Sequence, residues 1–232
     1  MKKVFYIVFF ITLTSFSSFC LAKDDITVAC LRNMREPEVI ITTSFGNLRY
    51  DNSKSRRTIT RMHANQYGGK VGKGKFLNGL STFEHELKLN FKIRKQTLLS
   101  GITCVYPTTI NLFLGVGEDP VIYIARDYSE DSCMYNLVLR HEQTHQQINQ
   151  SVLEYYLPII KERFLEVVRN NAVVGSNSDI DLERAQGELQ QKYLSVLNQL
   201  LEEIKTETDA EQAKLDNDKN YDYETQICKN RL

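Results

Sequence analysis

The sequence has no excess of either charge and lacks the motifs of several common sites. Its 232 residues hold 29 Lys and Arg against 29 Asp and Glu, so no basic footprint for nucleic acid is indicated. The glycine-rich stretch at 68–75 lacks the Gly-Lys-Ser/Thr ending of a phosphate-binding loop. No two cysteines have the Cys-x-x-Cys spacing of a structural zinc–thiolate site. We therefore expect no nucleic-acid partner, no nucleotide loop and no thiolate-bound zinc.

The first 22 residues have the pattern of a secretory signal peptide. A basic start at Met1–Lys3 precedes an apolar run from Val4 to about Leu13, and small residues stand at the last and third-last positions before Lys23. We predict cleavage after Ala22, a periplasmic or secreted protein, and no stable membrane anchor afterwards. A retained anchor is the alternative, because 4–22 is just long enough to span a bilayer, although five Ser and Thr hydroxyls dilute it.

Cleavage would leave four cysteines, an even number that predicts two disulfides in an oxidising compartment. We favour Cys30 with Cys104, because both flank strand-like segments, and Cys133 with Cys228, because both flank the helical region.

The remaining chain, residues 23–232, is predicted to form one α+β domain, with a mainly antiparallel sheet at about 26–126 and helices at about 131–217. The polar stretch Asn52–Lys75 has no apolar period and is expected to be an exposed loop or hairpin. Strands are expected at the β-branched, alternating or apolar runs 26–28, 39–43, 83–93, 109–114 and 121–125.

A helix is predicted to begin at the N-cap cluster Ser129–Ser132. Pro158 should kink or end it, after which helical spacing resumes up to Asn170-Asn171. The reversal is expected at Gly175–Ser178, and a second amphipathic helix from Ser178 or Asp179 should pack antiparallel to the first. The predicted fold thus ends in a motif helix and a long helical hairpin.

The first of these helices carries His141-Glu142-Gln143-Thr144-His145. Histidines four residues apart lie on one helix face, so their rings can chelate one metal ion with Glu142 beside it. This set predicts Zn²⁺ held by His141 and His145, with Glu142 as general base. With 4 His and 17 Glu, a shuffled chain would contain the pattern roughly once in two hundred trials, so chance explains it poorly.

The other two histidines are not predicted as ligands. His85 shares the inner face of its strand with apolar neighbours, which is more typical of a satisfied core histidine. His63, in the polar stretch, has no partner at ligand spacing.

A catalytic zinc needs three protein ligands, and the third is not evident. Counting back from the reversal along straight helices places His141 and His145 opposite about 203–211. Four acidic residues are candidates: Glu207 and Glu211 lie in that range, and Asp222 and Glu224 lie further on, within reach if Cys228 is tied to Cys133. The sequence does not distinguish among these four candidates.

The motif resembles that of the zincin metallopeptidases. Val138, Leu139 and the uncharged Gln143 and Thr144 fit the extended zincin pattern, whereas Gln147 stands where an apolar residue is usual. The resemblance implies an active-site helix beside a sheet whose edge strand binds a peptide or protein substrate.

The chain also resembles a bacterial family of secreted proteases inferred to depend on zinc, which end in Tyr-Asp-x-x-Thr-x-His-Gly. Tyr221, Asp222 and Thr225 match this ending, but Ile227 and Cys228 replace its His and Gly. If that His is the family's third ligand, the chain lacks it.

These observations predict a zinc metallopeptidase, with Tyr155, Tyr156, Tyr221 or Tyr223 as candidate donors to the oxyanion. The alternative, motivated by Ile227 and the long helical hairpin, is a catalytically degenerate envelope or partner-binding protein. A third hypothesis is a metal-dependent hydrolase of cell-wall peptides or another amide. The oligomeric state stays open.

Overall fold

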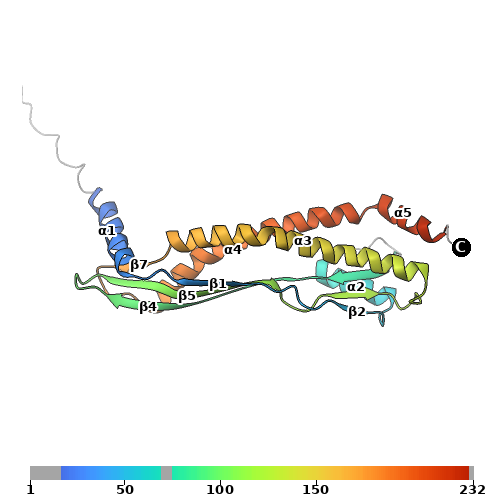
Figure 1. Ribbon diagram of the computed structural model, residues 1–232, viewed down its shortest axis with the longest axis horizontal. Coiled ribbons are helices and arrows are strands. Elements are labelled where there is room, and N and C mark those ends of the chain that lie inside the picture. Colours follow the sequence, from blue (N-terminus) through green and yellow to red (C-terminus); the bar gives the residue numbers. More distant parts are fainter. Residues whose placement is uncertain (1–16, 69–74, 230–232) are drawn as a thin grey trace, which may run out of the picture. The chain divides into compact units, whose positions relative to one another are not determined.

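A computed structural model describes residues 17–68 and 75–229 of the chain (Figure 1). Over these ranges the prediction of an α+β fold is confirmed, with the main strands in the N-terminal half and long helices in the C-terminal half. The helices are α1 (Ser17–Asn33), α2 (Arg56–Tyr67), α3 (Cys133–Asn170), α4 (Leu182–Leu215) and α5 (Asp218–Lys229). The strands are β1 (Glu38–Thr42), β2 (Arg49–Asp51), β3 (Gly79–Thr82), β4 (His85–Thr97), β5 (Thr103–Val116), β6 (Val121–Ile124) and β7 (Val174–Ser176).

Two sequence predictions fall partly outside the described residues. The predicted signal peptide has residues 1–16 outside them, and its predicted cleavage point after Ala22 lies within α1. Residues 69–74 of the glycine-rich stretch also lie outside them.

The strands form two sheets rather than one. The first has the order β1-β5-β4, with β7 antiparallel to β5. The second has the order β2-β6-β3, in which β3 is antiparallel and β2 parallel to β6. By their internal contacts the residues divide into unit 1 (Met1–Glu38, Phe91–Ile110 and Val168–Lys192) and unit 2 (Val39–Asn90, Asn111–Val167 and Tyr193–Leu232).

In unit 1, the predicted disulfide between Cys30 and Cys104 is present. It joins α1 to β5 inside a buried cluster with Tyr106 and Val173. The strand predicted at 26–28 is wrong, because these residues belong to α1. A Cβ on Gly175 of β7 would lie 2.7 Å from the Ile26 side chain, so packing against β7 outweighs the weak strand preference of β-branched residues.

In unit 2, the loop predicted at 52–75 is also wrong, because it contains α2. Ser55 caps this helix by accepting the Thr58 N–H, and Gly68 ends it with a left-handed φ of 67°. The helix buries Ile59 against Leu80 of β3. Among the residues of α2 whose burial is described, only Ile59 is buried, which leaves too little apolar period to be recognised.

The motif helix α3 begins at Cys133, where Ser132 accepts the Tyr135 N–H, as the N-cap cluster predicted. It continues through Pro158 without ending. Farther along, α3 buries Phe164 edge-to-face on Tyr193 of α4 at 5.9 Å between ring centroids. Since both side chains are 0% exposed, this contact stabilises the helix beyond the proline.

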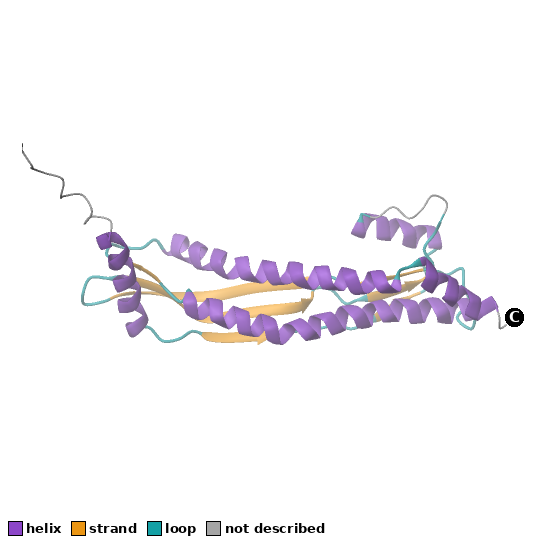
Figure 2. Cartoon of the chain, turned by 90° about the horizontal axis from the view of Figure 1, so that it is seen from above, coloured by secondary structure: helices purple, strands orange, loops and turns teal. Residues whose placement is uncertain are grey.

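Helices α3 and α4 run antiparallel side by side in unit 2 (Figure 2). Phe164 contacts Tyr193, while His145, earlier in α3, contacts Gln212, later in α4. Asp181 caps α4 by accepting the Arg184 N–H, so α4 begins at Leu182 rather than at the predicted 178 or 179.

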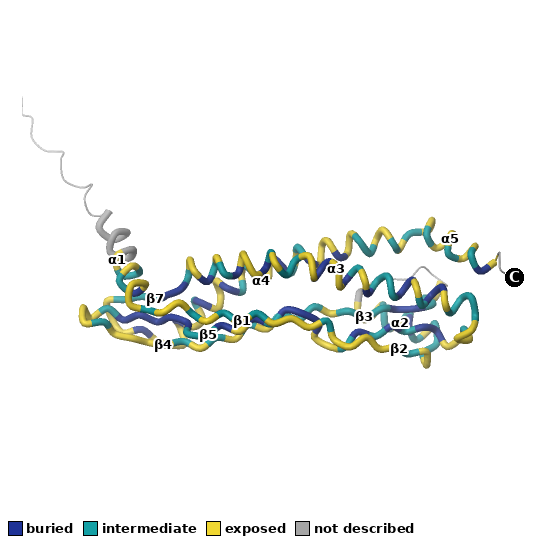
Figure 3. Tube along the Cα trace, in the orientation of Figure 1, coloured by how far each residue is buried: buried dark blue, intermediate teal, exposed yellow. Residues whose placement is uncertain are grey.

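The second sheet supports the first half of α3. Ile122 and Ile124 of β6 form a buried cluster with Val138 of α3. Figure 3 marks the buried parts of the trace in dark blue, including stretches of α3. Strand β3, at the edge of this sheet, comes close to α3 at Gly79, where an added Cβ would lie 2.5 Å from Glu142 Oε1 and 2.7 Å from Val138 Cγ1. A residue without a side chain is therefore required there.

We predict opposite effects for two Gly→Ala changes. Gly79→Ala should destabilise the protein by about 1–3 kcal/mol, because the new methyl group overpacks β3 against α3. Gly187→Ala should stabilise it by about 0.5–1 kcal/mol, because nothing lies within 4 Å of the new Cβ in α4. Urea denaturation of both variants measures this, and equal effects would contradict the close β3–α3 packing.

Candidate metal centre

The two motif histidines of α3 converge with an aspartate from the end of α4. His141 Nε2 lies 3.1 Å from His145 Nε2, as the helical spacing predicted. Asp216 Oδ1 lies 3.1 Å from the first of these nitrogens and 3.3 Å from the second. Asp216 follows the last residue of α4, Leu215, and precedes α5. In the described part of the chain, these three residues form a group able to hold a metal ion.

The spacing of these atoms fits zinc. Tetrahedral zinc with ligand bonds of about 2.0–2.1 Å has neighbouring ligand atoms ~3.3–3.4 Å apart. The three observed separations, 3.1, 3.1 and 3.3 Å, are close to this length. Two imidazoles and one carboxylate are also a donor set that zinc accepts, and three protein ligands leave a fourth position open. The residues present therefore fit a catalytic zinc.

The outer nitrogen of each histidine is held by an acceptor. The His141 Nδ1–H donates to the Glu224 carboxylate, at 3.2 Å from Oε2, and the His145 Nδ1–H donates to Gln212 Oε1. Gln212 is fixed in turn, because its amide donates to the His145 carbonyl at 3.2 Å and to Asn149 Oδ1 at 3.0 Å. These contacts orient each Nε2 toward the shared point, as outer partners do in metal sites.

Helix α5 is tied to the start of α3, which brings Glu224 to the site. The predicted disulfide between Cys133 and Cys228 is present, and Asn217 caps α5 by accepting the Asn220 N–H at 3.0 Å. Tyr221 of the same helix donates its hydroxyl to Asp216 Oδ1 at 2.6 Å. A helix break and a disulfide thus place two supporting side chains beside the ligands.

Glu142 lies between the histidines and strand β3 and is only 6% exposed. Burial raises the pKa of its carboxyl to about 7, although the charges of His145 and His141 and the Ser81 N–H oppose this. Such a pKa is close to that of an effective general base at neutral pH.

The histidines and the acidic side chains around them shift one another's pKa values. Burial lowers the pKa of His141, but the hydrogen bond with Asp216 and the charges of Glu142 and Glu224 outweigh it and raise this pKa to about 8. The pKa of Asp216 is held far below its usual range, because hydrogen bonds from His141, His145 and Tyr221 outweigh its burial. Without metal, a proton on His141 therefore neutralises part of this site.

The structure separates the four acidic candidates for third ligand. Glu224 contacts His141 from the outer side, Glu207 and Glu211 line a cavity farther along α3, and Asp222 is exposed on α5. Asp216 was not among the predicted ligands, because α4 starts later than expected. The residues of α4 that lie opposite His141 and His145 are therefore about one helical turn beyond 203–211. The polar run 216–220 ends the apolar stripe of α4 and could have indicated that the helix stops beside Asp216.

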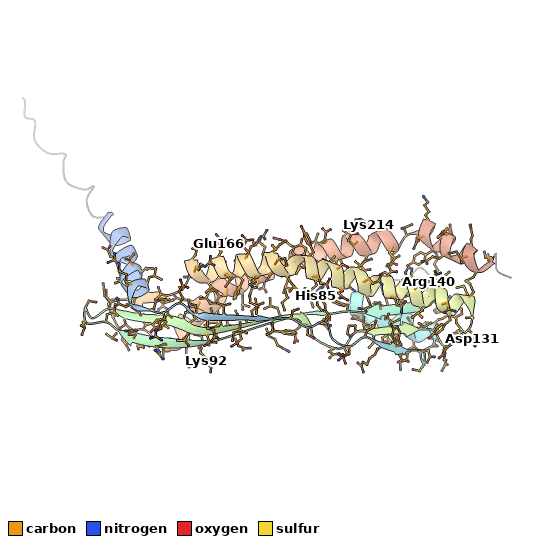
Figure 4. The ribbon with its side chains drawn as sticks, viewed as in Figure 1. His85, Lys92, Asp131, Arg140, Glu166 and Lys214 are labelled. Carbon is orange, nitrogen blue, oxygen red and sulfur yellow. A yellow bond between two sulfur atoms is a disulfide. The ribbon has the colours of Figure 1, made fainter. Side chains whose placement is uncertain are left out.

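The other predicted residues lie apart from the centre or support it. His85 opens β4 (Figure 4) and stacks edge-on against Phe83. Its Nε2 is buried without a hydrogen-bond partner among the described residues, and His85 does not belong to the group that could hold a metal ion. His63 lies on α2. Of the four candidate tyrosines, Tyr221 is the one that contacts a ligand of the group.

Comparisons with protein-family models, curated proteins and solved structures found no match. The proposals below therefore depend on the residues themselves.

We predict that the purified chain binds one zinc ion and that Asp216→Asn weakens this binding. The loss should exceed the about 10–100-fold effect of removing an outer partner, because a ligand charge is lost. Competition with a chromophoric chelator measures the affinity. Asp222→Asn, which removes an exposed carboxylate of α5, is the control, and an equal effect of both changes would contradict the assignment of Asp216.

We also predict that zinc affinity depends on pH below about 8. The His141 pKa of about 8 means that zinc must displace a proton there, so affinity should fall about tenfold per pH unit as the pH drops from 8 to 6. Calorimetric titration at several pH values measures the affinity, and a flat profile would contradict the prediction.

In the metal-free protein, the His141 contribution to stability should be complete below its ordinary pKa of 6.5 and be lost as the pH rises through 8.

Proposed function

We propose that the chain is a zinc-dependent metallopeptidase that hydrolyses peptide bonds with Glu142 as general base. The observation that carries this proposal is the convergence of His141 Nε2, His145 Nε2 and Asp216 Oδ1 next to a buried carboxyl with a pKa of about 7. When bound, zinc would lower the pKa of its water from about 15.7 to near 7 and polarise the scissile carbonyl.

The protein's own residues supply the proton transfers and the positioning. Glu142 accepts a proton from the attacking water and delivers it to the leaving amine, which its near-neutral pKa permits in both directions. The Ser81 N–H holds this carboxylate from the β3 side. Glu224 and Gln212 keep the two imidazoles oriented, and Tyr221 holds Asp216.

The position of Asp216 helps to distinguish an active enzyme from the alternative of a catalytically degenerate partner-binding protein. That alternative was motivated by Ile227, which stands where the resembling family has His. Asp216 provides a third donor at ligand distance from a different segment. The replacement at 227 therefore does not by itself leave the donor set incomplete, which favours an active enzyme.

The setting of this activity is proposed to be the periplasm or the cell exterior. The two disulfides are compatible with an oxidising compartment. No helix within residues 17–68 and 75–229 is both long and apolar enough to cross a membrane. The signal-peptide pattern of residues 1–22 supports export.

The test measures zinc content and peptide hydrolysis for three variants. Glu142→Gln should lose about 10²–10⁴-fold in rate while it retains zinc, because the base is removed and the ligands remain. His145→Ala should lose both zinc and activity, because it removes a ligand. Glu166→Gln, which changes an exposed glutamate of the same helix (Figure 4), should keep both.

Two results would count against the proposal. A chain that binds no zinc at neutral pH is not a zinc enzyme. A chain that binds zinc but cleaves nothing in a broad peptide library would favour the partner-binding alternative.

A further inference from the structure

A cavity of about 550 Å³ lies between α3 and α4 in unit 2, beside the candidate metal centre. Helix α3 provides most of its lining and α4 provides two glutamates. The lining residues are Thr144, Gln147, Ile148, Ser151, Val152, Tyr155, Tyr156, Glu207 and Glu211.

The cavity adjoins the metal ligands on both helices. On α3 its first residue, Thr144, directly precedes His145. On α4 its last residue, Glu211, directly precedes Gln212, which accepts the His145 hydrogen bond. From Thr144 to Tyr156 the helix advances about 18 Å, which matches about five residues of an extended peptide. A peptide that reaches the metal centre can therefore continue into this groove.

The opposite side of α3 offers less room for a peptide. There the motif helix already uses the hydrogen-bonding groups of the β3 edge. The Ser81 N–H binds Glu142, and the Gln146 amide donates to the Thr82 carbonyl at 2.9 Å and to the Ser81 hydroxyl at 2.5 Å. An extended substrate would have to displace these contacts to pair with β3 at that point, whereas the groove on the α4 side is open.

The groove is acidic, and one of its carboxylates lacks a direct ion pair. No Lys or Arg belongs to the lining. Lys214, labelled in Figure 4, pairs with Glu211 of the same helix. The charge of Glu207 also acts on Lys214, but Glu207 makes no ion pair or hydrogen bond within the described part of the chain. Burial raises the pKa of the Tyr156 phenol, and the negative charge of Glu207 raises it further. Glu207 therefore lies near Tyr156.

Beside Glu207, the groove has an aromatic wall and an apolar floor. Tyr155 and Tyr156 stack edge-to-face at 5.4 Å between ring centroids, and Tyr155 is 67% exposed. Ile148 and Val152 form the apolar part. This combination suits a side chain with an aliphatic stem and a cationic head, since the stem covers the apolar residues and the cation meets the rings and the carboxylate.

We propose that this α3–α4 groove binds an Arg or Lys side chain of the peptide substrate, with Glu207 and the Tyr155–Tyr156 pair as the residues that recognise it. The inference rests on the proposed peptidase function, because it assigns the substrate preference of that same site. It makes the enzyme selective for peptides with a basic residue a few positions from the scissile bond.

The test uses dodecapeptide libraries with one fixed position, occupied by Arg, Lys, citrulline or Glu, and random neutral residues elsewhere. Citrulline is the matched probe, because it has nearly the shape of Arg without its charge. Binding to the zinc-loaded Glu142→Gln protein is measured by fluorescence anisotropy, and cleavage is measured with the native chain. The Arg library should bind about tenfold better than the citrulline library, from one exposed ion pair and one cation–π contact.

Two variants assign the preference to the groove. Glu207→Gln should reduce the Arg-to-citrulline ratio to about two to five, because the cation–π contact remains. Glu202→Gln, which changes an exposed glutamate of α4 outside the lining, should leave the ratio unchanged. Tyr155→Leu should lower the ratio by about two- to fivefold through loss of the cation–π contact.

The outcomes separate this inference from the function on which it rests. Cleavage without a preference for Arg, or with a preference that Glu207→Gln leaves unchanged, would overturn the groove assignment and leave the peptidase intact. An Arg preference in binding that Glu207→Gln lowers, without cleavage by the native chain, would support the groove and refute the peptidase. Absence of binding by every library would overturn the groove assignment.

Discussion

The geometry of unit 2 depends on holding three polar atoms, His141 Nε2, His145 Nε2 and Asp216 Oδ1, at 3.1–3.3 Å from one another. The two imidazoles are only 7% and 13% exposed, and ring nitrogens this close together are costly to bury unless a proton or a metal ion lies between them. Their convergence requires that α4 end beside the motif, that α5 turn back, and that the Cys133–Cys228 bridge hold α5 there. The long helices serve to meet this requirement.

The two sides of α3 differ in how closely they are packed. The side toward β3 is closely packed, since a Cβ on Gly79 would clash with Glu142. This contact buries the carboxyl and raises its pKa to about 7, so the close packing also sets the acidity of the proposed general base. The side toward α4 is hollowed and acidic. If the proposed function holds, a helix packed on one side and open on the other leaves its motif accessible to a peptide.

The proposed zinc site would be complete despite Ile227, because other residues supply the third donor and its supporting contacts. In the resembling family a terminal His follows Tyr-Asp-x-x-Thr; here the same helix instead provides Tyr221 and Glu224, which hold Asp216 and His141. The proposed third ligand, Asp216, is the residue that follows α4. A donor from a helix end adapts to the site more easily than one from a helix interior, because the backbone there is not bound to helical geometry.

The sequence by itself determined the features that depend on local spacing: the paired histidines, the capped start of α3 and the strands from β4 to β6. The even cysteine count predicted two disulfides, and of the three possible pairings the favoured one is present. Tertiary structure alone decided α1, α2 and Asp216. A β-branched run became helix where it packed against β7, and a polar segment became helix by burying Ile59. Asp216 depended on where α4 starts and stops against α3, and that register is set by contacts such as Phe164 on Tyr193, far apart in the sequence.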